Sequence, residues 1–374
     1  MTGRRVSRTF IHLRRDAGGL HLRVPDIVPA VAPFLQGLGW SGHPAQTDQL
    51  ALGVAHWPTL RELGLPHLGP DWRARATSDL WAAHLVAMAR WRAGETASGS
   101  PTLLDLKTEL ARRESSPCRQ CALRCLAGRD AGEQGACGAT NETRVFSFEL
   151  LAAEEPGLGI GIAPRLSGCN ASCLYCSRPD GIPARAGHRV TPEEVAAWVD
   201  EGAARVDGLH WIGGNVDQEL AFIFAVMTRL ATPLPVIWNH NATATPEVTV
   251  ALLEGLVDVW LPDLRFGPGP CAVALGAPVM SFANCTAAIE AELRQAATVC
   301  VRVLVVPNHL ECCAMPILAW LAKRRDRLFV SLMNYAYAPL RFAAGDPQIG
   351  RCLTEAEMGV IDGLMDELKL RRVG

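Results

Sequence analysis

Three cysteines lie close together in the segment GCNASCLYC, residues 168–176: Cys169, Cys173 and Cys176. Cysteine thiolates are ligands for zinc and for iron–sulfur clusters, and a cluster of four irons takes four ligands. Three thiolates in one compact loop would leave one iron open to a small molecule. The alternative is a zinc site closed by a distant fourth ligand, such as His188 or a downstream cysteine. The spacing predicts a metal centre, and an open iron is the favoured interpretation.

Four further cysteines precede this loop with the spacing C-x2-C-x3-C-x11-C: Cys118, Cys121, Cys125 and Cys137. Four thiolates close a tetrahedral site, which holds either zinc or an iron–sulfur centre. The segment around them is too polar to form a core of its own, so a metal would have to hold it together. Free thiols are the alternative. We predict a second metal here, zinc or iron–sulfur.

Cysteine usage and composition support metal binding in a reducing compartment. Seven of the thirteen cysteines fall between residues 118 and 176. The N-terminus lacks the apolar segment of a signal peptide, which makes disulfides the weaker explanation. A formal charge of −2 and apolar runs of strand length give no sign of a nucleic-acid or membrane partner. We expect a cytoplasmic protein that binds neither.

The elements that would position these cysteines alternate between strand and helix from residue 159 onward. Strands are predicted over 159–167, 207–214, 235–240, 257–264, 299–307 and 328–334, and helices over 191–206, 217–231, 245–256, 286–297, 312–325 and 354–369. This alternation is typical of parallel β/α proteins, and six strands fit an open barrel. We predict a partial (β/α)6 TIM-like barrel over 151–374, with functional residues at the C-terminal strand ends.

Two smaller regions are predicted upstream of the barrel: an N-terminal accessory domain over 1–100 and a four-cysteine metal-binding segment over 101–150. Helices are expected over 77–93, capped by Thr77 or Ser78, and over 102–114. The small and polar residues 94–101 between them are predicted to form a linker.

The segment CNASCLYC resembles the cluster motif of radical S-adenosylmethionine (SAM) enzymes. The resemblance covers about residues 102–374 and is closest to a branch similar to pyruvate formate-lyase activating enzymes. The segments LLDLKTELARR, VDVWLPDLRFG and VRVLVVPNHLECC also resemble recurring segments of that branch. The resemblance implies that the three cysteines bind a [4Fe–4S] cluster and that SAM chelates the open iron. Reductive cleavage of SAM would then give a 5′-deoxyadenosyl radical that abstracts hydrogen from a substrate.

The same resemblance implies where SAM is bound. The segment WIGGNVD matches a family element that meets the methionine amino group, with Gly213 and Gly214 in place and Asn215 where the family has an acid. An amide oxygen accepts a hydrogen bond but carries no charge, so Asp217 is the candidate that would compensate.

Polar residues at strand ends are further candidates for SAM contacts: Asn239, Asp263 and Arg302. Arg302 interrupts an apolar strand, so we expect it to point inward and pair with an acid, because an unpaired buried charge is costly. Cys313 and Tyr335 are candidate catalytic residues beside the substrate, Cys313 as a hydrogen donor. Cys312 is its neighbour in sequence, and adjacent cysteines do not easily bind one metal together.

The predicted function is that of a radical SAM enzyme acting on a small-molecule or peptide substrate, with a flavodoxin- or ferredoxin-type electron donor. The N-terminal hundred residues would serve as a lid or hold a peptide. The pair Ser177-Arg178 replaces the Gln-Asn pair usual in the branch, which indicates a different substrate. A glycyl-radical activase is one alternative, and a non-catalytic iron–sulfur or zinc protein is another.

Overall fold

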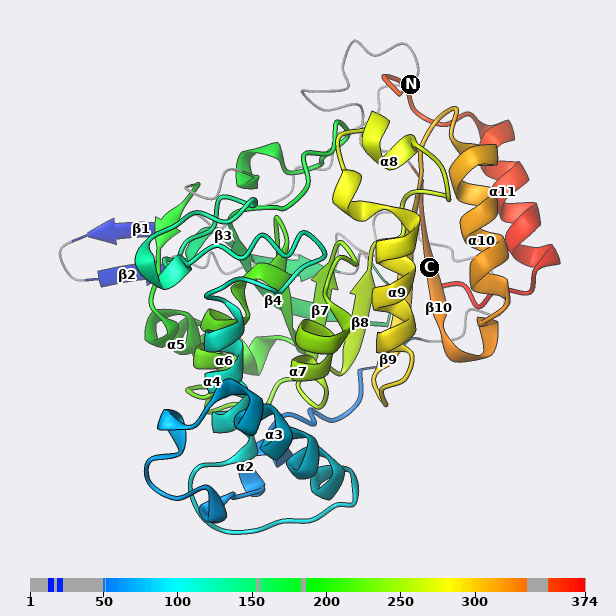
Figure 1. Cartoon of the computed structure of the whole chain (residues 1–374). Helices are drawn as coiled ribbons and strands as arrows, with labels where there is room; N and C mark the ends of the chain where they lie inside the picture. Colours follow the sequence, from blue (N-terminus) through cyan, green and yellow to red (C-terminus); the bar gives the residue numbers. More distant parts are fainter. Residues whose placement is uncertain are drawn as a thin grey trace.

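The computed structural model describes residues 50–373 except 51, 153–154, 156, 183–185 and 335–348. It also describes two short antiparallel strands near the N-terminus, β1 (Leu13–Asp16) and β2 (Gly19–Leu22). No helix among these residues has the length and apolar character needed to cross a bilayer. The described chain forms one layered α/β body, shown in Figure 1.

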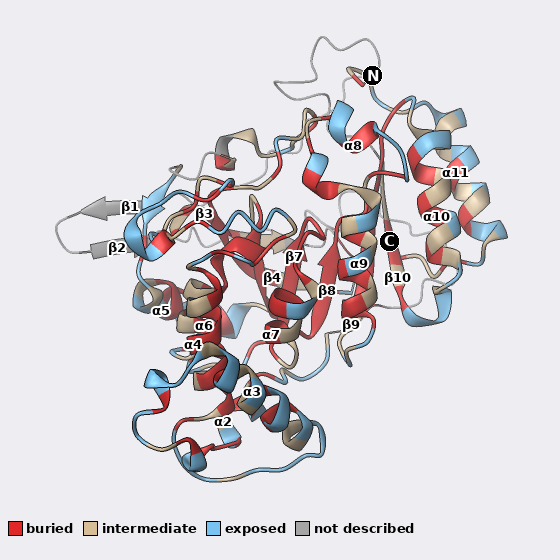
Figure 2. Cartoon of the chain, in the orientation of Figure 1, coloured by how far each residue is buried: buried red, intermediate tan, exposed pale blue. Residues whose placement is uncertain are grey.

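The centre of the molecule is an eight-stranded sheet in the order β10-β9-β8-β7-β6-β4-β3-β5. Its parallel strands are β4 (Ile160–Leu166), β6 (Gly208–Gly213), β7 (Val236–His240), β8 (Val259–Pro262), β9 (Thr298–Val305) and β10 (Phe329–Asn334). These are the six strands that the sequence predicted, so the prediction of an open, partial (β/α)6 barrel is confirmed. Apolar and β-branched residues fill the strands, and Figure 2 shows them buried between helices and loops.

Two antiparallel strands that the sequence analysis missed extend one edge of this sheet. Strand β3 (Arg144–Ala152) pairs with β4, and the two-residue strand β5 (His188–Arg189) pairs with β3. The predicted boundary at residue 150 falls inside β3. At the opposite edge, the last described residues pair with β10, because Val330 N donates to Arg371 O and Val373 N donates to Val330 O.

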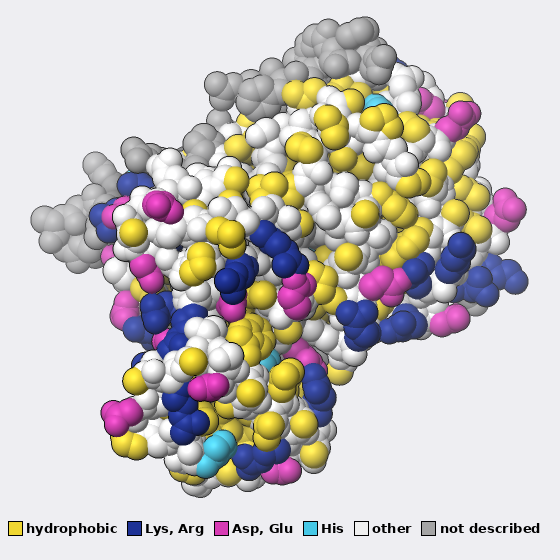
Figure 3. Space-filling view, in the orientation of Figure 1, with side chains coloured by type: hydrophobic (Ala, Val, Ile, Leu, Met, Phe, Trp, Pro, Cys, Tyr) yellow, Lys and Arg dark blue, Asp and Glu magenta, His cyan; other side chains and the backbone are white. Residues whose placement is uncertain are grey.

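Helices follow the parallel strands and cover the outside of the sheet (Figure 1). They are α5 (Pro192–Gly202), α6 (Leu220–Met227), α7 (Ala251–Leu253), α9 (Phe282–Glu292), α10 (Met315–Ala322) and α11 (Glu355–Glu367), with a short helix α8 (Cys271–Ala274) after β8. The helices α6, α7 and α10 are preceded by a 3-10 turn, η6 (Val216–Glu219), and two π-helical turns, η7 (Pro246–Val250) and η9 (Leu310–Ala314). On the visible face, acidic and basic side chains are interspersed (Figure 3).

Helix starts follow local chemistry, with one difference from the sequence prediction. Thr191 caps α5 in a reciprocal capping box with Glu194, as its position before Pro192 predicted. The predicted cap of α3 (Thr77–Arg92) is wrong, because Ala76 occupies the N-cap position. Thr77 lies inside the first turn, where its hydroxyl accepts a hydrogen bond from Arg113 at 3.2 Å.

The helices α2 (Thr59–Glu62), α3 and α4 (Leu103–Glu114) pack together at the end of the sheet where strands β7 and β8 begin (Figure 1). Trp57 Nε1 donates to Leu234 O at 3.0 Å, just before β7, and His56 N donates to the Asp258 carboxylate at 3.1 Å, just before β8. A lid formed by residues 50–100 over the C-terminal strand ends is therefore wrong, because these residues lie at the opposite end.

The predicted linker over residues 94–101 is held in place by backbone pairing. Gly64 N donates to Ala97 O at 2.6 Å, and Leu103 N donates to Leu63 O at 2.9 Å. Residues 50–100 thus share a hydrophobic core with α4 and the sheet. The accessory domain predicted over residues 1–100 stays a prediction, because only strands β1 and β2 are described among residues 1–49.

Candidate functional site

A cavity opens at the C-terminal ends of the parallel strands, where β/α proteins form their sites. It brings together most of the residues predicted from the sequence: Cys169, Cys173, Cys176, Gly213, Gly214, Asn239, Asp263 and Arg302. Tyr175, Arg165, Arg178, His240 and Arg265 also line it.

The three-cysteine loop begins three residues after β4 and is anchored by its backbone. Ser172 N donates to Gly276 O at 3.0 Å, and Leu174 N donates to Leu275 O at 3.1 Å. These bonds attach the loop to the segment that follows α8. All three cysteines line one cavity, and the backbone of their loop is held by residues 275–276.

The surroundings of two of these thiols raise their pKa values. Burial raises the pKa of Cys169, and the neighbouring Cys173 and Cys176 raise it further. Burial raises the pKa of Cys173 to about 11, although the Arg265 guanidinium opposes this. A metal that binds Cys169 and Cys173 must therefore displace their protons. A converging set of three thiols is a fitting donor set for an iron–sulfur cluster.

Of the glycine pair at the end of β6, Gly213 packs on Leu166 of β4 and Gly214 packs directly on the cysteine loop. A Cβ atom on Gly214 would lie 2.0 Å from Gly168 O and 3.1 Å from Cys169 Cβ. Any side chain at this position would push the loop away, since glycine alone permits so close a backbone approach. Gly214 therefore positions the cysteines whether or not it also contacts a ligand.

Asn215 and Asp217 lie beneath the cavity rather than in its described lining. Asn215 Nδ2 donates to Asp217 Oδ2 at 3.3 Å, and Asn215 Oδ1 accepts from Asn241 N at 3.4 Å. Asp217 also accepts from Trp238 Nε1 at 2.9 Å and lies 3.2 Å from His240 Nδ1. Both side chains are thus used inside a buried network, and this placement does not favour direct contact with a SAM amino group.

His240 lines the cavity and is buried between two carboxylates. Its Nδ1 faces Asp217, and its Nε2 lies 3.2 Å from Glu292 Oε1. Burial alone would lower its pKa, but the two carboxylates raise the pKa of His240 to about 10. Asp217 belongs to η6 and Glu292 to α9, so the sequence around His240 gives no sign of its two acidic partners.

Two predicted polar residues present unsatisfied atoms at the cavity. Asn239 Nδ2 and Asp263 Oδ1 are buried and have no hydrogen-bond partner among the described residues. The other oxygen of Asp263 accepts a hydrogen bond from Arg265 at 2.5 Å. Because buried polar atoms are rarely left unpaired, these two atoms indicate a polar ligand.

Three of the arginines that line the cavity are held by carboxylates outside its described lining. Arg302 pairs with Glu155 through contacts of 2.5 and 2.7 Å, which confirms that it points inward and pairs with an acid. Glu149 of β3 receives Arg165 at 2.7 Å and Arg178 at 3.2 Å. Arg178, two residues after the last cysteine of the loop, is therefore fixed at the cavity wall.

The four upstream cysteines lie in a segment docked beside the three-cysteine loop. Ala122 N donates to Thr243 O at 2.8 Å, and Thr245 N donates to Gln120 O at 3.2 Å. Asn170, from within the cysteine loop, donates to Thr243 Oγ1 at 2.8 Å and accepts from Asn241 at 2.7 Å. One short polar segment after β7 thus contacts both cysteine sets.

Three of these four thiols are buried, and the fourth is exposed. Burial raises the pKa of Cys118 and Cys121, and that of Cys137 to about 11. Burial acts in the same direction on Cys125, but backbone hydrogen bonds and the Arg129 guanidinium lower the pKa of this thiol. A Cβ atom on Gly135 would lie 3.4 Å from Cys137 Sγ and 3.5 Å from Cys125 Sγ, so these two sulfurs face the same space.

The two predicted catalytic residues are not placed at the described cavity. Tyr335 lies outside the described residues. Cys313 is buried after β9, where its thiol faces Cys271, His309 and Cys312. Its role as a hydrogen donor stays a prediction.

The fold and site define an open parallel α/β barrel with a thiol-lined cavity at its C-terminal strand ends. No protein-family model matches the chain. The uncharacterized protein MJ0674 of Methanocaldococcus jannaschii is 30% identical over 269 residues, which cover 69% of this chain and 77% of that protein. The chain belongs to the same family as MJ0674.

Solved structures give weaker likenesses. QueE from Escherichia coli matches 62% of this chain and 92% of its own, with 11% identity and a TM-score of 0.37. The protein anSMEcpe, solved with AdoMet and a peptide, matches 57% of this chain and 61% of its own, with 16% identity and a TM-score of 0.41. The radical S-adenosylmethionine methyltransferase TsrM from Kitasatospora setae matches 46% of this chain and 34% of its own, with 17% identity and a TM-score of 0.36. All three scores are low, and the fold rests on the strand order itself.

Proposed function

We propose that this protein is a radical SAM enzyme. The observation that carries the proposal is the convergence of Cys169, Cys173 and Cys176 on one cavity at the C-terminal strand ends. A closed zinc site would need a fourth ligand beside these thiols, and the first candidate, His188, is exposed on the edge strand β5. Among the described residues, none of the three cysteines belongs to a group of three or more ligand atoms within 4.8 Å of one another, which a closed zinc site would need, and this favours a cluster with one open iron.

In this proposal the three cysteines hold a [4Fe–4S] cluster, and the polar residues of the cavity hold SAM. When bound, the reduced cluster and SAM together supply a 5′-deoxyadenosyl radical that abstracts a hydrogen atom from the substrate. Asn239 Nδ2 and Asp263 Oδ1 are the unpaired atoms that would bind SAM hydroxyl or carboxylate groups. Arg302, fixed by Glu155, would face its carboxylate, and Gly213 and Gly214 would line its methionine end.

The proposal also includes a substrate, a second metal and an electron donor. The substrate is a small molecule or a peptide, and Arg178 at the cavity wall would meet an anionic or polar group on it. Cys118, Cys121, Cys125 and Cys137 would hold a second metal, zinc or iron–sulfur. A flavodoxin- or ferredoxin-type protein would supply the electron.

Anaerobic reconstitution with iron and sulfide, followed by dithionite and SAM, tests this proposal. The wild-type chain should form 5′-deoxyadenosine, and Cys173→Ala should abolish its formation, because the cluster would lose one of three protein ligands. Cys352→Ala is the control, since Cys352 is exposed and outside both cysteine sets. An intact four-iron cluster that yields no 5′-deoxyadenosine would refute the proposal and favour a non-catalytic iron–sulfur protein.

A further inference from the structure

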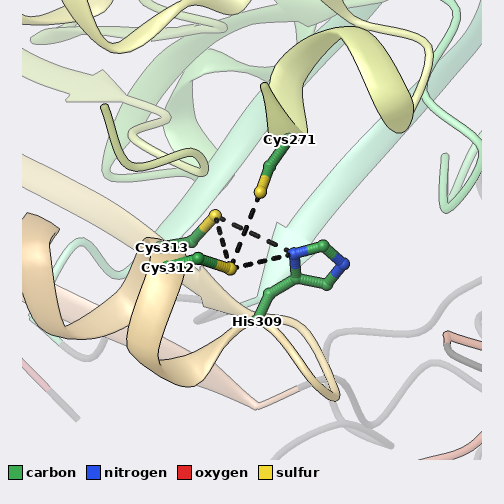
Figure 4. Close-up of side chains that lie close together, drawn as sticks. All are labelled: Cys271, His309, Cys312 and Cys313. Atoms are coloured by element: carbon green, nitrogen blue, oxygen red, sulfur yellow. Dashed lines mark hydrogen bonds between the residues drawn. The ribbon is translucent and has the colours of Figure 1, made fainter. Parts of the chain in front are cut away.

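Four metal-ligating side chains converge outside the cavity, and the sequence analysis did not group them. They are Cys271, His309, Cys312 and Cys313, whose ligand atoms all lie within 4.8 Å of one another. Figure 4 shows them pointing toward one another, Cys271 from α8 and the other three from η9 and the residue before it. In the described part of the chain, no other group of three or more cysteine, histidine or acidic residues has its ligand atoms so close together.

Four of the six distances between these ligand atoms are known, and they are close to the edges of a tetrahedron around one metal ion. Cys312 Sγ lies 3.6 Å from Cys271 Sγ and 3.9 Å from Cys313 Sγ. His309 Nδ1 lies 3.4 Å from Cys312 Sγ and 4.0 Å from Cys313 Sγ. A tetrahedral zinc with Zn–S bonds of about 2.3 Å and Zn–N bonds of about 2.0 Å has sulfur–sulfur edges of about 3.8 Å and sulfur–nitrogen edges of about 3.5 Å.

The local fold explains why adjacent cysteines can share this site, contrary to the expectation from their sequence positions. His309, Cys312 and Cys313 are spaced i, i+3 and i+4, which places them on one side of a helical turn. The turn is π-helical, and its greater width brings the two successive thiols closer to one face. Such widened turns occur frequently at functional sites.

The fourth side chain is brought in by a close backbone contact. Gly267 lies against η9, and a Cβ atom there would come within 2.0 Å of Cys312 O. Only glycine allows this approach, which carries the following residues of the β8–α8 connection, and with them Cys271, onto the other three ligands.

We propose that Cys271, His309, Cys312 and Cys313 form a structural zinc site. Three cysteines and one histidine are a common closed ligand set for structural zinc. A four-iron cluster places each of its ligands on a different iron, which requires wider sulfur separations than these. The inference does not depend on the proposed radical SAM function, because none of the four residues belongs to the described cavity lining.

The zinc would connect two loops that reach the cavity. One is the β8–α8 connection, which carries Asp263 and Arg265 and continues through Cys271 to Leu275 and Gly276, the residues that anchor the three-cysteine loop. The other begins after β9, whose Arg302 lines the cavity. The zinc site would therefore fix the residues after α8 to which the three-cysteine loop is hydrogen-bonded.

Zinc content of the full-length chain tests this proposal. The double variant Cys271→Ala/Cys312→Ala should contain about one zinc per chain less than the wild type, because two of four ligands are lost. Cys300→Ala/Cys352→Ala is a matched control, since it also removes one buried and one exposed cysteine, and it should keep the wild-type zinc content. Equal zinc in the wild type and the first variant would overturn the proposal, as would iron or copper in place of zinc.

Alkylation of the wild-type chain gives a second test that does not depend on how the variants fold. Cys312 and Cys352 are both exposed. In the zinc-loaded chain Cys312 should react with iodoacetamide at least ten-fold more slowly than Cys352, and a chelator should remove the difference. Equal reactivity before chelation, or a disulfide between Cys271 and Cys312 in the isolated chain, would overturn the proposal. Measuring iron and 5′-deoxyadenosine in the same samples separates this result from the outcome for the proposed function.

Discussion

At the scale of single residues, the candidate site combines predicted ligands with partners that no spacing could reveal. The cysteines and strand-end polar residues were predicted because their types and positions carry chemistry. Glu149 and Glu155 were not, since they pair with Arg165 and Arg302 across 16 and 147 positions of sequence. Such pairs depend on strand register and loop path, which local patterns do not contain.

The same limit applies to Cys271 and Cys312, which are 41 residues apart. Neither has the short cysteine spacing that identified the other two sets. His309, Cys312 and Cys313 are close in sequence, but this spacing indicates a metal site only when a helical turn brings both thiols to the same face.

Lys107 gives a prediction at this scale, because it is a fully buried amine. Its Nζ donates to Leu252 O at 3.0 Å, and burial lowers its pKa to about 7, although Glu254 opposes this. In the unfolded chain the amine titrates near pH ~10.4. Between these values the folded chain binds fewer protons, so the amine's contribution to stability increases as the pH rises.

We expect the free energy of unfolding of the wild type, relative to that of Lys107→Met, to increase by about 1 kcal/mol per pH unit between pH ~7.5 and ~9.5. Urea unfolding of both chains across this range measures it. Taking the difference cancels the titration of the cysteines, which both chains share. A difference that does not change with pH would mean that the buried amine keeps its proton.

At the scale of elements, the β/α alternation was predictable because each parallel strand is a short apolar run that is followed by a helix-forming segment. Strands β3 and β5 were missed because they are antiparallel and lie outside that alternation. Helix starts were predictable where the capping residues are complete, as at Thr191, and not where they are incomplete, as at Thr77.

The two helix starts give a prediction for α5 and α3. Thr191→Ala should lower the free energy of unfolding by about 1 kcal/mol, because the Glu194 backbone N–H loses its acceptor. Ser78→Ala should change it by less than about 0.5 kcal/mol, since Ser78 is exposed and caps no helix. Chemical denaturation compares them. Equal effects at both positions would mean that Thr191 acts through something other than its cap.

At the scale of the whole molecule, the four upstream cysteines and the three-cysteine loop both pack against the barrel through the segment that follows β7. The upstream segment contacts residues 243–245, and Asn170 of the cysteine loop contacts the same segment. The helices α2–α4 lie at the other end of the sheet, so the structure separates the end that packs the N-terminal helices from the end that carries the cavity.

This arrangement predicts that loss of the proposed metal at Cys118, Cys121, Cys125 and Cys137 loosens residues 243–245, which also contact the three-cysteine loop. Cys118→Ser/Cys137→Ser should speed amide hydrogen exchange at residues 120–122 and 243–245, because their mutual hydrogen bonds lose the support of the metal-bound segment. Exchange in α11 should not change, and Cys300→Ala/Cys352→Ala should match the wild type. Unchanged exchange at 243–245 would show that the segment docks without its metal.

The edges of the sheet carry a final consequence. An open sheet offers unpaired backbone groups at its outer strands, and these can recruit another chain into an aggregate. Here one edge is occupied by Arg371 and Val373, which pair with Val330 of β10. The other ends in β5, which has two exposed residues, His188 and Arg189. Each addition covers only part of its edge strand, since β5 pairs with Arg144 and Val145 of β3, and the C-terminal residues bond to Val330 of β10. At those positions the backbone groups are already paired and are not available to a second chain.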